Sequence, residues 1–398
     1  MSLNDTVSAD RIHIGFFGMR NAGKSSLVNA ITGQELCVVS NIKGTTTDPV
    51  KKAMEILPLG PVVIIDTPGL DDSGELGKKR IKKAKQILSQ IDIAVLAVDA
   101  TVGLSKEDQD LIKIFKEKNI SYIIAMCKAD LLPKDKRKND KNIMYVSSTR
   151  NEGIFDLKEK LGEFAKLKSE KKYIVADLLK KGDIVVLVIP IDESAPKGRI
   201  ILPQQLVLRE LLDANCTAIA CQATELKNTL KALKNKPKLV ITDSQAFEIA
   251  NDNTPREIAL TSFSILFARY KGNLNELIKG AKTLKKLKDG NKVLISEGCT
   301  HHRQCNDIGT VKLPAWIENY SKAKLSFEFT SGYDFSQDLS KFKLIVHCGG
   351  CMLNKNEMQN RIACAKNFNV PIVNYGIAIA QMKGILDRGL EVFKNKKV

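Results

Sequence analysis

The segment over residues 12–25 constrains the fold of this chain more than any other part of the sequence. The apolar run IHIGFF is followed by GMRNAGKS, which has glycines at positions 18 and 23 and then Lys24 and Ser25. When this pattern joins a β-strand to an α-helix, its backbone N–H groups surround phosphate oxygens, and the helix N-terminus favours their negative charge. The sequence therefore predicts a strand, a phosphate-binding loop and a helix at the start of a parallel α/β sheet.

The rest of the chain alternates short apolar runs with amphipathic helical stretches. With 398 residues, of which 43% are hydrophobic and 27% charged, the chain has material for two or three globular domains. Strand-like runs separated by helices are typical of mainly parallel sheets. We predict an α/β fold of three domains over residues 8–168, 177–261 and 262–398, each built on a mainly parallel sheet with flanking helices.

Three loops are expected to hold the phosphates and a magnesium ion. Lys24 can reach the β- and γ-phosphates, and the Ser25 hydroxyl can bind Mg²⁺. The apolar run VVII ends in DTPG, which places Asp66 to hold Mg²⁺ through water and the Gly69 N–H to contact the γ-phosphate. The segment GTTTD lies between these loops, and its Thr46 is predicted to be the second magnesium ligand.

Two further loops indicate that the base is guanine. CKAD over residues 127–130 ends an apolar run, and Asp130 can accept hydrogen bonds from guanine N1 and N2, which adenine cannot supply. The first residue of this motif is usually Asn, so Cys127 is expected to weaken base binding, while the SST segment at 147–149 is expected over guanine O6. The predicted nucleotide-binding residues are Gly18, Asn21, Ala22, Gly23, Lys24, Ser25, Ser26, Thr46, Asp66, Gly69, Lys128, Asp130, Ser147 and Ser148.

The sequence predicts slow GTP hydrolysis. Leu70 follows Gly69 at the position where Ras-like proteins have a Gln that orients water. The segment resembles GTPases of the TrmE and Era type, and this resemblance implies that Asn21 coordinates a potassium ion near the β- and γ-phosphates. Asn21 could instead be a turn residue. The predicted catalytic residues are Asn21, Lys24, Thr46 and Gly69.

Two groups of metal-ligand residues follow strand-like runs in the last third of the chain. Cys299 and His301 follow KVLISEG, and HCGGC over residues 347–351 follows KLIV. Because strand carboxyl ends converge in an open parallel sheet, both groups are expected to face one site. Three thiolates with one exchangeable position suit a 4Fe–4S cluster, whereas the same residues also suit a structural zinc ion. The spacing alone does not separate these two.

The chain as a whole resembles the HydF family, the GTPase scaffolds of FeFe-hydrogenase maturation. The resemblance rests on the GTPase loops, on GRIILPQQLVLRELLDANC, and on the C-terminal CTH and HCGGC motifs. It implies that Cys299, Cys348 and Cys351 bind a 4Fe–4S cluster, that His301 and His347 have variable roles, and that the middle domain forms a homodimer. It also implies that a diiron precursor is received from the radical-SAM maturases HydE and HydG and delivered to the apo FeFe-hydrogenase.

The net charge of +17 leaves an alternative function open. Clustered Lys and Arg gain affinity for nucleic acid by releasing counterions, which would fit a GTPase that acts on RNA or ribosomes through a C-terminal zinc module. The lysines recur along the whole chain, however, and no aromatic RNA-binding pattern accompanies them, so nucleic acid is not the favoured partner. A third interpretation is an iron–sulfur redox or sensor protein whose affinity for a partner is tuned by GTP.

Cysteine content and hydropathy favour a reducing compartment. Nine Cys in a chain of this length argue for reduced thiols rather than for a disulfide framework. No run approaches the ~20 apolar residues of a membrane span. The first ten residues, MSLNDTVSAD, lack the basic and apolar regions of a signal peptide. We therefore expect a cytoplasmic protein without a membrane partner.

Overall fold

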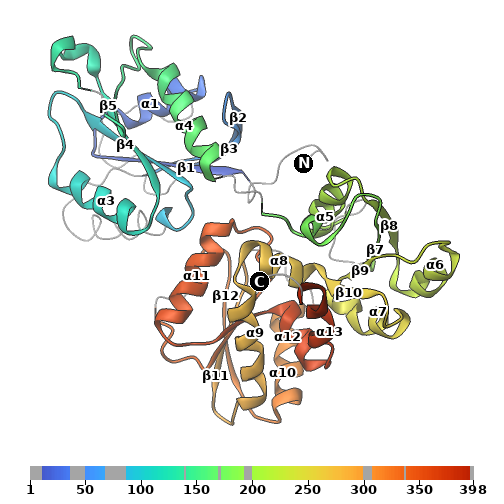
Figure 1. Cartoon of the computed structure of the whole chain (residues 1–398). Helices are drawn as coiled ribbons and strands as arrows, with labels where there is room; N and C mark the ends of the chain where they lie inside the picture. Colours follow the sequence, from blue (N-terminus) through green and yellow to red (C-terminus); the bar gives the residue numbers. More distant parts are fainter. Residues whose placement is uncertain are drawn as a thin grey trace. The chain divides into compact units, whose positions relative to one another are not determined.

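The computed structural model describes residues 11–35, 50–67, 87–138, 140–168, 172–191, 200–298, 307–335 and 338–394. The chain divides into two compact units, residues 1–170 and 171–398 (Figure 1). Each unit consists of mainly parallel sheets flanked by helices, which confirms the predicted α/β class.

The first unit contains a six-stranded sheet in the order β2-β3-β1-β4-β5-β6. Every neighbouring pair is parallel except β2 and β3, which are antiparallel. The strands are β1 (Ile12–Gly18), β2 (Val50–Ile56), β3 (Gly60–Asp66), β4 (Ile93–Asp99), β5 (Ser121–Cys127) and β6 (Ile143–Tyr145), and the helices are α1 (Lys24–Thr32), α3 (Lys106–Glu117) and α4 (Ile154–Lys168).

The central strands of this sheet are buried on both faces, which explains their unbroken apolar sequences. Side chains alternate between the faces of a strand. In β4, Ile93 and Val95 belong to the core formed with α1 and α4, whereas Ala94 and Leu96 belong to the core formed with α3. Strand β4 is thereby fixed in register, and its carboxyl end lies beside that of β1.

The second unit contains two four-stranded sheets, and all neighbouring strands in them are parallel. The first has the order β10-β9-β7-β8, with β7 (Ile184–Val188), β8 (Thr217–Cys221), β9 (Leu239–Thr242) and β10 (Ala259–Ser262). The second has the order β12-β11-β13-β14, with β11 (Lys292–Ser296), β12 (Ser326–Thr330), β13 (Leu344–His347) and β14 (Ile372–Asn374).

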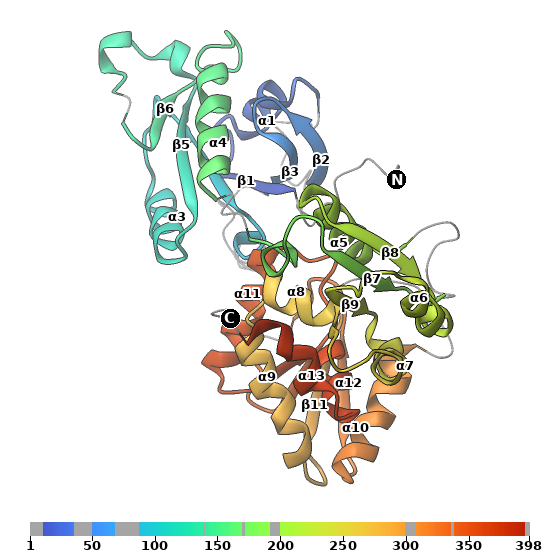
Figure 2. The same ribbon diagram turned by 45° about the vertical axis from the view of Figure 1, so that its right-hand side comes forward.

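One continuous hydrophobic core joins these two sheets and their helices. Helix α8 packs against α5 from the first sheet and against α11 and α12 from the second (Figure 2). Because the sheets share a core, the predicted boundary between residues 261 and 262 remains a prediction. The helices are α5 (Leu202–Asp213), α6 (Leu226–Ala232), α7 (Phe247–Asn253), α8 (Phe263–Lys271), α9 (Leu274–Thr283), α10 (Leu313–Ser321), α11 (Lys355–Asn367), α12 (Tyr375–Met382) and α13 (Leu386–Leu390).

A buried arginine ties the last helix of the second unit to the first sheet of that unit. Arg388 on α13 donates hydrogen bonds to the carbonyl oxygens of Asn251, Thr254 and Pro255, at distances of 2.6–3.0 Å. The Thr261 hydroxyl on β10 donates to the Gly389 carbonyl oxygen at 2.9 Å. These contacts join segments more than a hundred residues apart.

Among the described helices, none is both long and apolar enough to cross a membrane.

Candidate functional site

The predicted phosphate-binding loop lies between β1 and α1, as its sequence requires. Gly23 adopts a φ of 95°, and a Cβ at Gly18 would lie 2.4 Å from the carbonyl oxygen of Ala97 on β4. Glycine is therefore needed at position 23 because of the backbone conformation and at position 18 because of the close approach of Ala97. Asn21 has a φ of 59°, a left-handed conformation that Asn tolerates better than most residues. This conformation gives Asn21 a local structural role in addition to the proposed potassium contact.

Lys24 and Asp66, predicted to contact phosphate and magnesium, lie together. The Lys24 Nζ forms an ion pair with the Asp66 carboxylate, and both side chains are largely buried, with 11% and 13% exposed. Their contact follows from strand pairing, since Phe16 on β1 is in register with Asp66 on β3. The Thr67 hydroxyl also donates to the Phe16 carbonyl oxygen at 2.7 Å. Of the other predicted residues of this group, Ser25 follows Lys24 in the first turn of α1, whereas Thr46 and Gly69 lie outside the described residues.

The two predicted base-binding loops meet at the carboxyl ends of β5 and β6. The Ala129 N–H donates to the Val146 carbonyl oxygen at 3.1 Å, which brings Asp130 beside Ser147. A hydrogen bond from the Ser147 side chain holds the pKa of Asp130 below its usual range. Asp130 is therefore an anion at neutral pH, as an acceptor for guanine N–H groups must be. Ser148 follows within the described residues of the same loop.

An aspartate that the sequence motifs did not identify supports the base loop. Asp99, at the carboxyl end of β4, accepts a hydrogen bond from Lys128 Nζ at 2.6 Å and from the Thr101 N–H at 2.9 Å. Burial pushes the pKa of Asp99 upward, but these hydrogen bonds outweigh it, and the pKa lies below the usual value. The sequence did contain a signal for Asp99, since it ends an apolar run. Functional residues of parallel sheets lie at such strand carboxyl ends.

Cys127 takes part in the packing beneath the phosphate loop. It is buried, its Sγ donates to the Ala125 carbonyl oxygen at 3.4 Å, and a Cβ at Gly23 would lie 3.0 Å from the Cys127 Cβ. Burial raises the pKa of the Cys127 thiol to about 12, so it stays neutral. The small thiol thus lets the base loop pack closely against the phosphate loop. Its expected effect on guanine affinity remains a prediction.

In the second unit, the ends of β11 and β13 bring part of the predicted metal site together. Ser296 on β11 is in register with His347 on β13, and the Cys348 N–H donates to the Ser296 carbonyl oxygen at 2.9 Å. The Cys348 Sγ accepts hydrogen bonds from the N–H groups of Gly298 at 2.9 Å and Gly350 at 3.4 Å. N–H donors aimed at sulfur favour the thiolate form that metals bind.

The structure describes only part of the rest of the predicted metal site. Gly298, the residue before Cys299, contacts Cys348, whereas Cys299 and His301 themselves lie outside the described residues. Within the described part of the chain, no three His, Cys, Asp or Glu side chains surround a common metal position. The convergence of all five predicted ligands therefore remains a prediction.

Cys351 lies beside a buried lysine that the sequence did not point to. Lys271, the last residue of α8, is 2% exposed, and its Nζ donates to the carbonyl oxygens of Cys351 at 3.2 Å and Leu353 at 3.1 Å. Burial raises the pKa of the Cys351 thiol, and the Lys271 ammonium opposes this effect. The cation thus favours the thiolate of a residue predicted to be a metal ligand.

Both ring nitrogens of His347 are engaged by protein groups. Arg361 has only donors, so its Nη1 donates to His347 Nε2 at 2.9 Å, and His347 Nδ1–H donates to the Cys348 carbonyl oxygen at 2.7 Å. Burial, and then the Arg361 charge, lower the pKa of His347 to about 3, so the ring is neutral. To bind a metal, His347 would have to exchange one of these contacts, and its role as a ligand remains a prediction.

Arg361 on α11 is fully buried because partners from several elements satisfy its guanidinium group. It pairs with Glu357 one helical turn earlier at 2.8 Å and donates to the Gly332 carbonyl oxygen at 2.7 Å and to the Ser296 hydroxyl at 3.3 Å. The Phe335 ring centroid lies 5.0 Å from its Cζ. These contacts tie the carboxyl ends of β11 and β13 to the segment that follows β12.

A carboxylate also lies near Cys348. Glu297 is 4% exposed, and its Oε1 accepts a hydrogen bond from the Tyr375 hydroxyl at 3.5 Å. Burial, followed by the charges of Cys348, Glu297 and Asp307, raises the pKa of Tyr375. Tyr375 is therefore a neutral donor in a region rich in negative charge. The only signal for Glu297 in the sequence is weak: it is an acidic residue two positions before Cys299.

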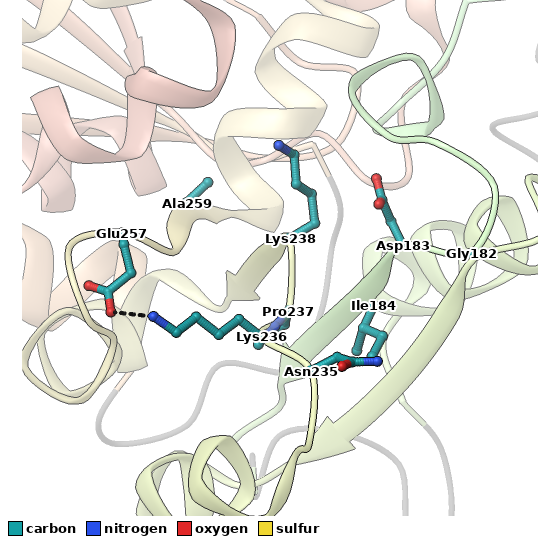
Figure 3. A pocket seen from close by; sticks show the side chains of 9 residues that line it. All are labelled: Gly182, Asp183, Ile184, Asn235, Lys236, Pro237, Lys238, Glu257 and Ala259. Carbon is teal, nitrogen blue, oxygen red and sulfur yellow. Dashed lines mark hydrogen bonds and ion pairs between the residues drawn. The ribbon is translucent and has the colours of Figure 1, made fainter.

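A polar depression lies at the amino ends of the strands in the first sheet of the second unit. Its volume is about 320 Å³, and it is lined by residues at the starts of β7, β9 and β10, including Asp183, Lys238 and an ion pair between Lys236 and Glu257 at 3.1 Å (Figure 3). Ligands of parallel sheets bind at strand carboxyl ends, whereas this hollow is at the amino ends. It contains none of the predicted site residues.

Comparisons with known proteins assign all three parts of the chain. Residues 13–128 match a family model described as a 50S ribosome-binding GTPase. Residues 174–272 match the hydrogen maturase F dimerization domain, and residues 275–392 match the hydrogen maturase F tetramerization domain. The GTPase match covers the phosphate loop, Asp66 and Lys128, and the other two matches cover both sheets of the second unit.

Similarity to individual proteins concentrates in the GTPase part. GTPase Der of Kosmotoga olearia is 32% identical over 171 residues, which are 38% of this chain and 38% of that protein. The tRNA modification GTPase MnmE of Desulforamulus reducens is 38% identical over 108 residues, which are 27% of this chain and 23% of that protein. The chain thus spans well under half the length of these relatives.

A solved structure of Era from Aquifex aeolicus, bound to GDP.AlF4⁻, is 16% identical, with 80% of this chain and 93% of that chain covered and a TM-score of 0.35. Identity and TM-score this low say nothing about function. The two matches named for hydrogen maturase F together account for residues 174–272 and 275–392, and a GTPase domain precedes them. The chain belongs to the hydrogen maturase F family and carries an N-terminal GTPase domain followed by the family's dimerization and tetramerization domains.

Proposed function

We propose that this protein is a GTP-hydrolysing scaffold that holds a 4Fe–4S cluster through Cys299, Cys348 and Cys351. In this proposal it receives the diiron precursor of the FeFe-hydrogenase active site from HydE and HydG and delivers it to the apo-hydrogenase. The observation that carries the proposal is the presence of both hydrogen maturase F domains, the second of which contains a Cys348 thiol that accepts two backbone hydrogen bonds.

The residues at the ends of β11 and β13 fit an iron–sulfur cluster. Backbone N–H groups directed at cysteine sulfur are a common means of tuning such clusters. Gly350, with a φ of 63°, lets the chain turn between Cys348 and Cys351, and a Cβ at Gly298 would lie only 3.5 Å from the Cys348 Sγ. Three thiolates leave one iron with an exchangeable position. When bound, the cluster would offer this position to a ligand of the precursor.

Residues of the first unit support the GTPase part of the proposal. The paired Lys24 and Asp66 place a cation for the phosphates next to a carboxylate for magnesium. Asp130, held as an anion by Ser147, is suited to accept the N–H donors of guanine. We infer that GTP is preferred over ATP. The coupling between hydrolysis and precursor transfer would depend on the oligomer that the second unit forms, for which we propose a homodimer.

Activation of a hydrogenase tests the proposed function as a whole. The protein is purified without air, incubated with the two maturases and their substrates, re-isolated, and added to apo FeFe-hydrogenase. Hydrogen evolution should appear only in samples that contain the re-isolated protein. Iron and zinc contents are measured on the same preparation. Stoichiometric zinc without iron, together with no activation, would contradict the proposal and favour the RNA-associated GTPase with a zinc module.

Potassium is expected to raise GTP turnover several-fold above sodium. Leu70 cannot orient the attacking water, so a cation beside Asn21 would supply positive charge to the transferring phosphoryl group. Phosphate release in matched potassium and sodium chloride measures the effect, and Asn21→Ala should remove the difference between the salts. Because Asn21 has a φ of 59°, Asn21→Gly serves as the matched variant that lacks the amide but keeps the conformation. Equal rates in both salts would show that Asn21 is a turn residue only.

A further inference from the structure

The lysine at the end of α8 lies at the junction between the two matched oligomerisation domains. Lys271 falls within the dimerization match at 174–272, whereas its hydrogen-bond partners, Cys351 and Leu353, fall within the tetramerization match at 275–392. The close packing of Gly272 fixes this junction, since a Cβ there would lie 2.9 Å from the Ala268 carbonyl oxygen and 3.3 Å from Ile362 Cδ1 on α11.

The environment of the Lys271 ammonium group is unusual for a lysine. It is 2% exposed, it donates to two carbonyl oxygens, and it lies 5.9 Å from the centroid of the Phe267 ring. Removing an ammonium ion from water is costly, and a cation buried this deeply acts strongly on the groups around it because water screens it little.

Lys271 binds the carbonyl groups of Cys351, the last residue of the HCGGC loop, and of Leu353, two residues beyond it. The loop is fixed at its start by the Cys348 N–H bond to Ser296 and at its turn by the Leu353 N–H bond to the Gly350 carbonyl oxygen at 3.1 Å. The two bonds from Lys271 fix the end, on either side of the exposed Met352. Cys351 therefore owes its backbone position to a side chain 80 residues earlier.

We propose that Lys271 is a positioning residue for the cluster: it holds Cys351 in place for binding, and its buried charge raises the reduction potential of the bound cluster. This inference rests on the proposed function, because it requires a cluster on Cys348 and Cys351. A 4Fe–4S cluster becomes more negative by one charge when an external reductant gives it an electron. A cation held in a site of low dielectric constant stabilises the reduced form more than the oxidised form.

The test is a redox titration of the full-length protein, with anaerobically reconstituted cluster and dithionite as reductant, followed by electron paramagnetic resonance. Lys271→Met should shift the midpoint potential to more negative values or reduce the cluster content. Lys271→Arg, which keeps the charge and donors, should restore both. Lys279→Met removes the same charge from α9, where the side chain is 70% exposed, and should leave the potential unchanged because water screens it.

The outcomes separate this inference from the proposed function. A native protein that takes up no cluster would contradict the proposed function itself. A native cluster with the same potential and iron content in Lys271→Met would overturn the inference about Lys271 and leave the proposed function intact. A Lys271→Arg variant that behaves like Lys271→Met would overturn it as well. Loss of the cluster in Lys271→Met, with retained GTP hydrolysis and recovery in Lys271→Arg, would support it.

Discussion

Replacing any one of Cys299, Cys348 and Cys351 with serine is expected to remove most of the iron that the protein binds after anaerobic reconstitution. Serine oxygen is a harder and more basic ligand than thiolate sulfur, and it replaces sulfur poorly in iron–sulfur clusters. At Cys348 the change also removes the sulfur that accepts the Gly298 and Gly350 N–H groups. Iron and sulfide analysis, with the visible absorption of the cluster, measures the loss.

A matched control keeps this result specific. Cys221 lies on β8, the edge strand of the other sheet, and burial raises the pKa of its thiol. Cys221→Ser should therefore bind the native amount of iron. GTP hydrolysis should survive in all these variants, because the nucleotide loops belong to the compact unit of residues 1–170. Full iron content in the triple variant of Cys299, Cys348 and Cys351 would contradict the assignment of the cluster ligands.

Short sequence motifs predicted the nucleotide-binding loops, because the residues of each loop are neighbours in the sequence. The GMRNAGKS motif fixed the strand, loop and helix around Lys24, and the positions of DTPG, CKAD and SST after apolar runs placed their residues at strand carboxyl ends. Parallel strands gather such ends at one edge of a sheet, which is why Asp130 and Ser147 meet. The same reasoning predicts that Cys299 and the HCGGC residues face one site, and the structure brings Gly298, the residue before Cys299, to Cys348.

The buried cations could not be predicted in this way. Arg361 lies on the polar helix α11 and Lys271 is the last residue of the mostly apolar helix α8, yet their side chains are 0% and 2% exposed. Their burial depends on partners far along the chain, such as Leu353 for Lys271 and Gly332 for Arg361. No local pattern encodes a contact across 82 residues. The shared core of the two sheets in the second unit could not be predicted from the sequence for the same reason.

Lys24→Ala is expected to lower GTP hydrolysis by about 10²- to 10³-fold, the usual loss when one charged or hydrogen-bonding group that stabilises a transition state is removed. The predicted contact is between the Lys24 ammonium and the oxygens of the β- and γ-phosphates. Lys24 is suited to this contact because strand register brings it to Asp66, the predicted magnesium residue. Phosphate release at saturating GTP measures the change, and the binding of a fluorescent GTP analogue shows how much of it is lost affinity.

Two comparisons decide whether the loss at Lys24 arises from the phosphate site. Lys106→Ala removes an exposed lysine from the start of α3 in the same unit and should hydrolyse GTP at the native rate. Asp130→Asn should reduce activity with GTP while Lys24 is intact, because an amide cannot accept both guanine N–H groups in the way a carboxylate does. Native turnover in Lys24→Ala, or equal turnover of GTP and ATP by the unaltered protein, would show that these loops do not form the catalytic guanine-nucleotide site argued from Lys24, Asp66 and Asp130.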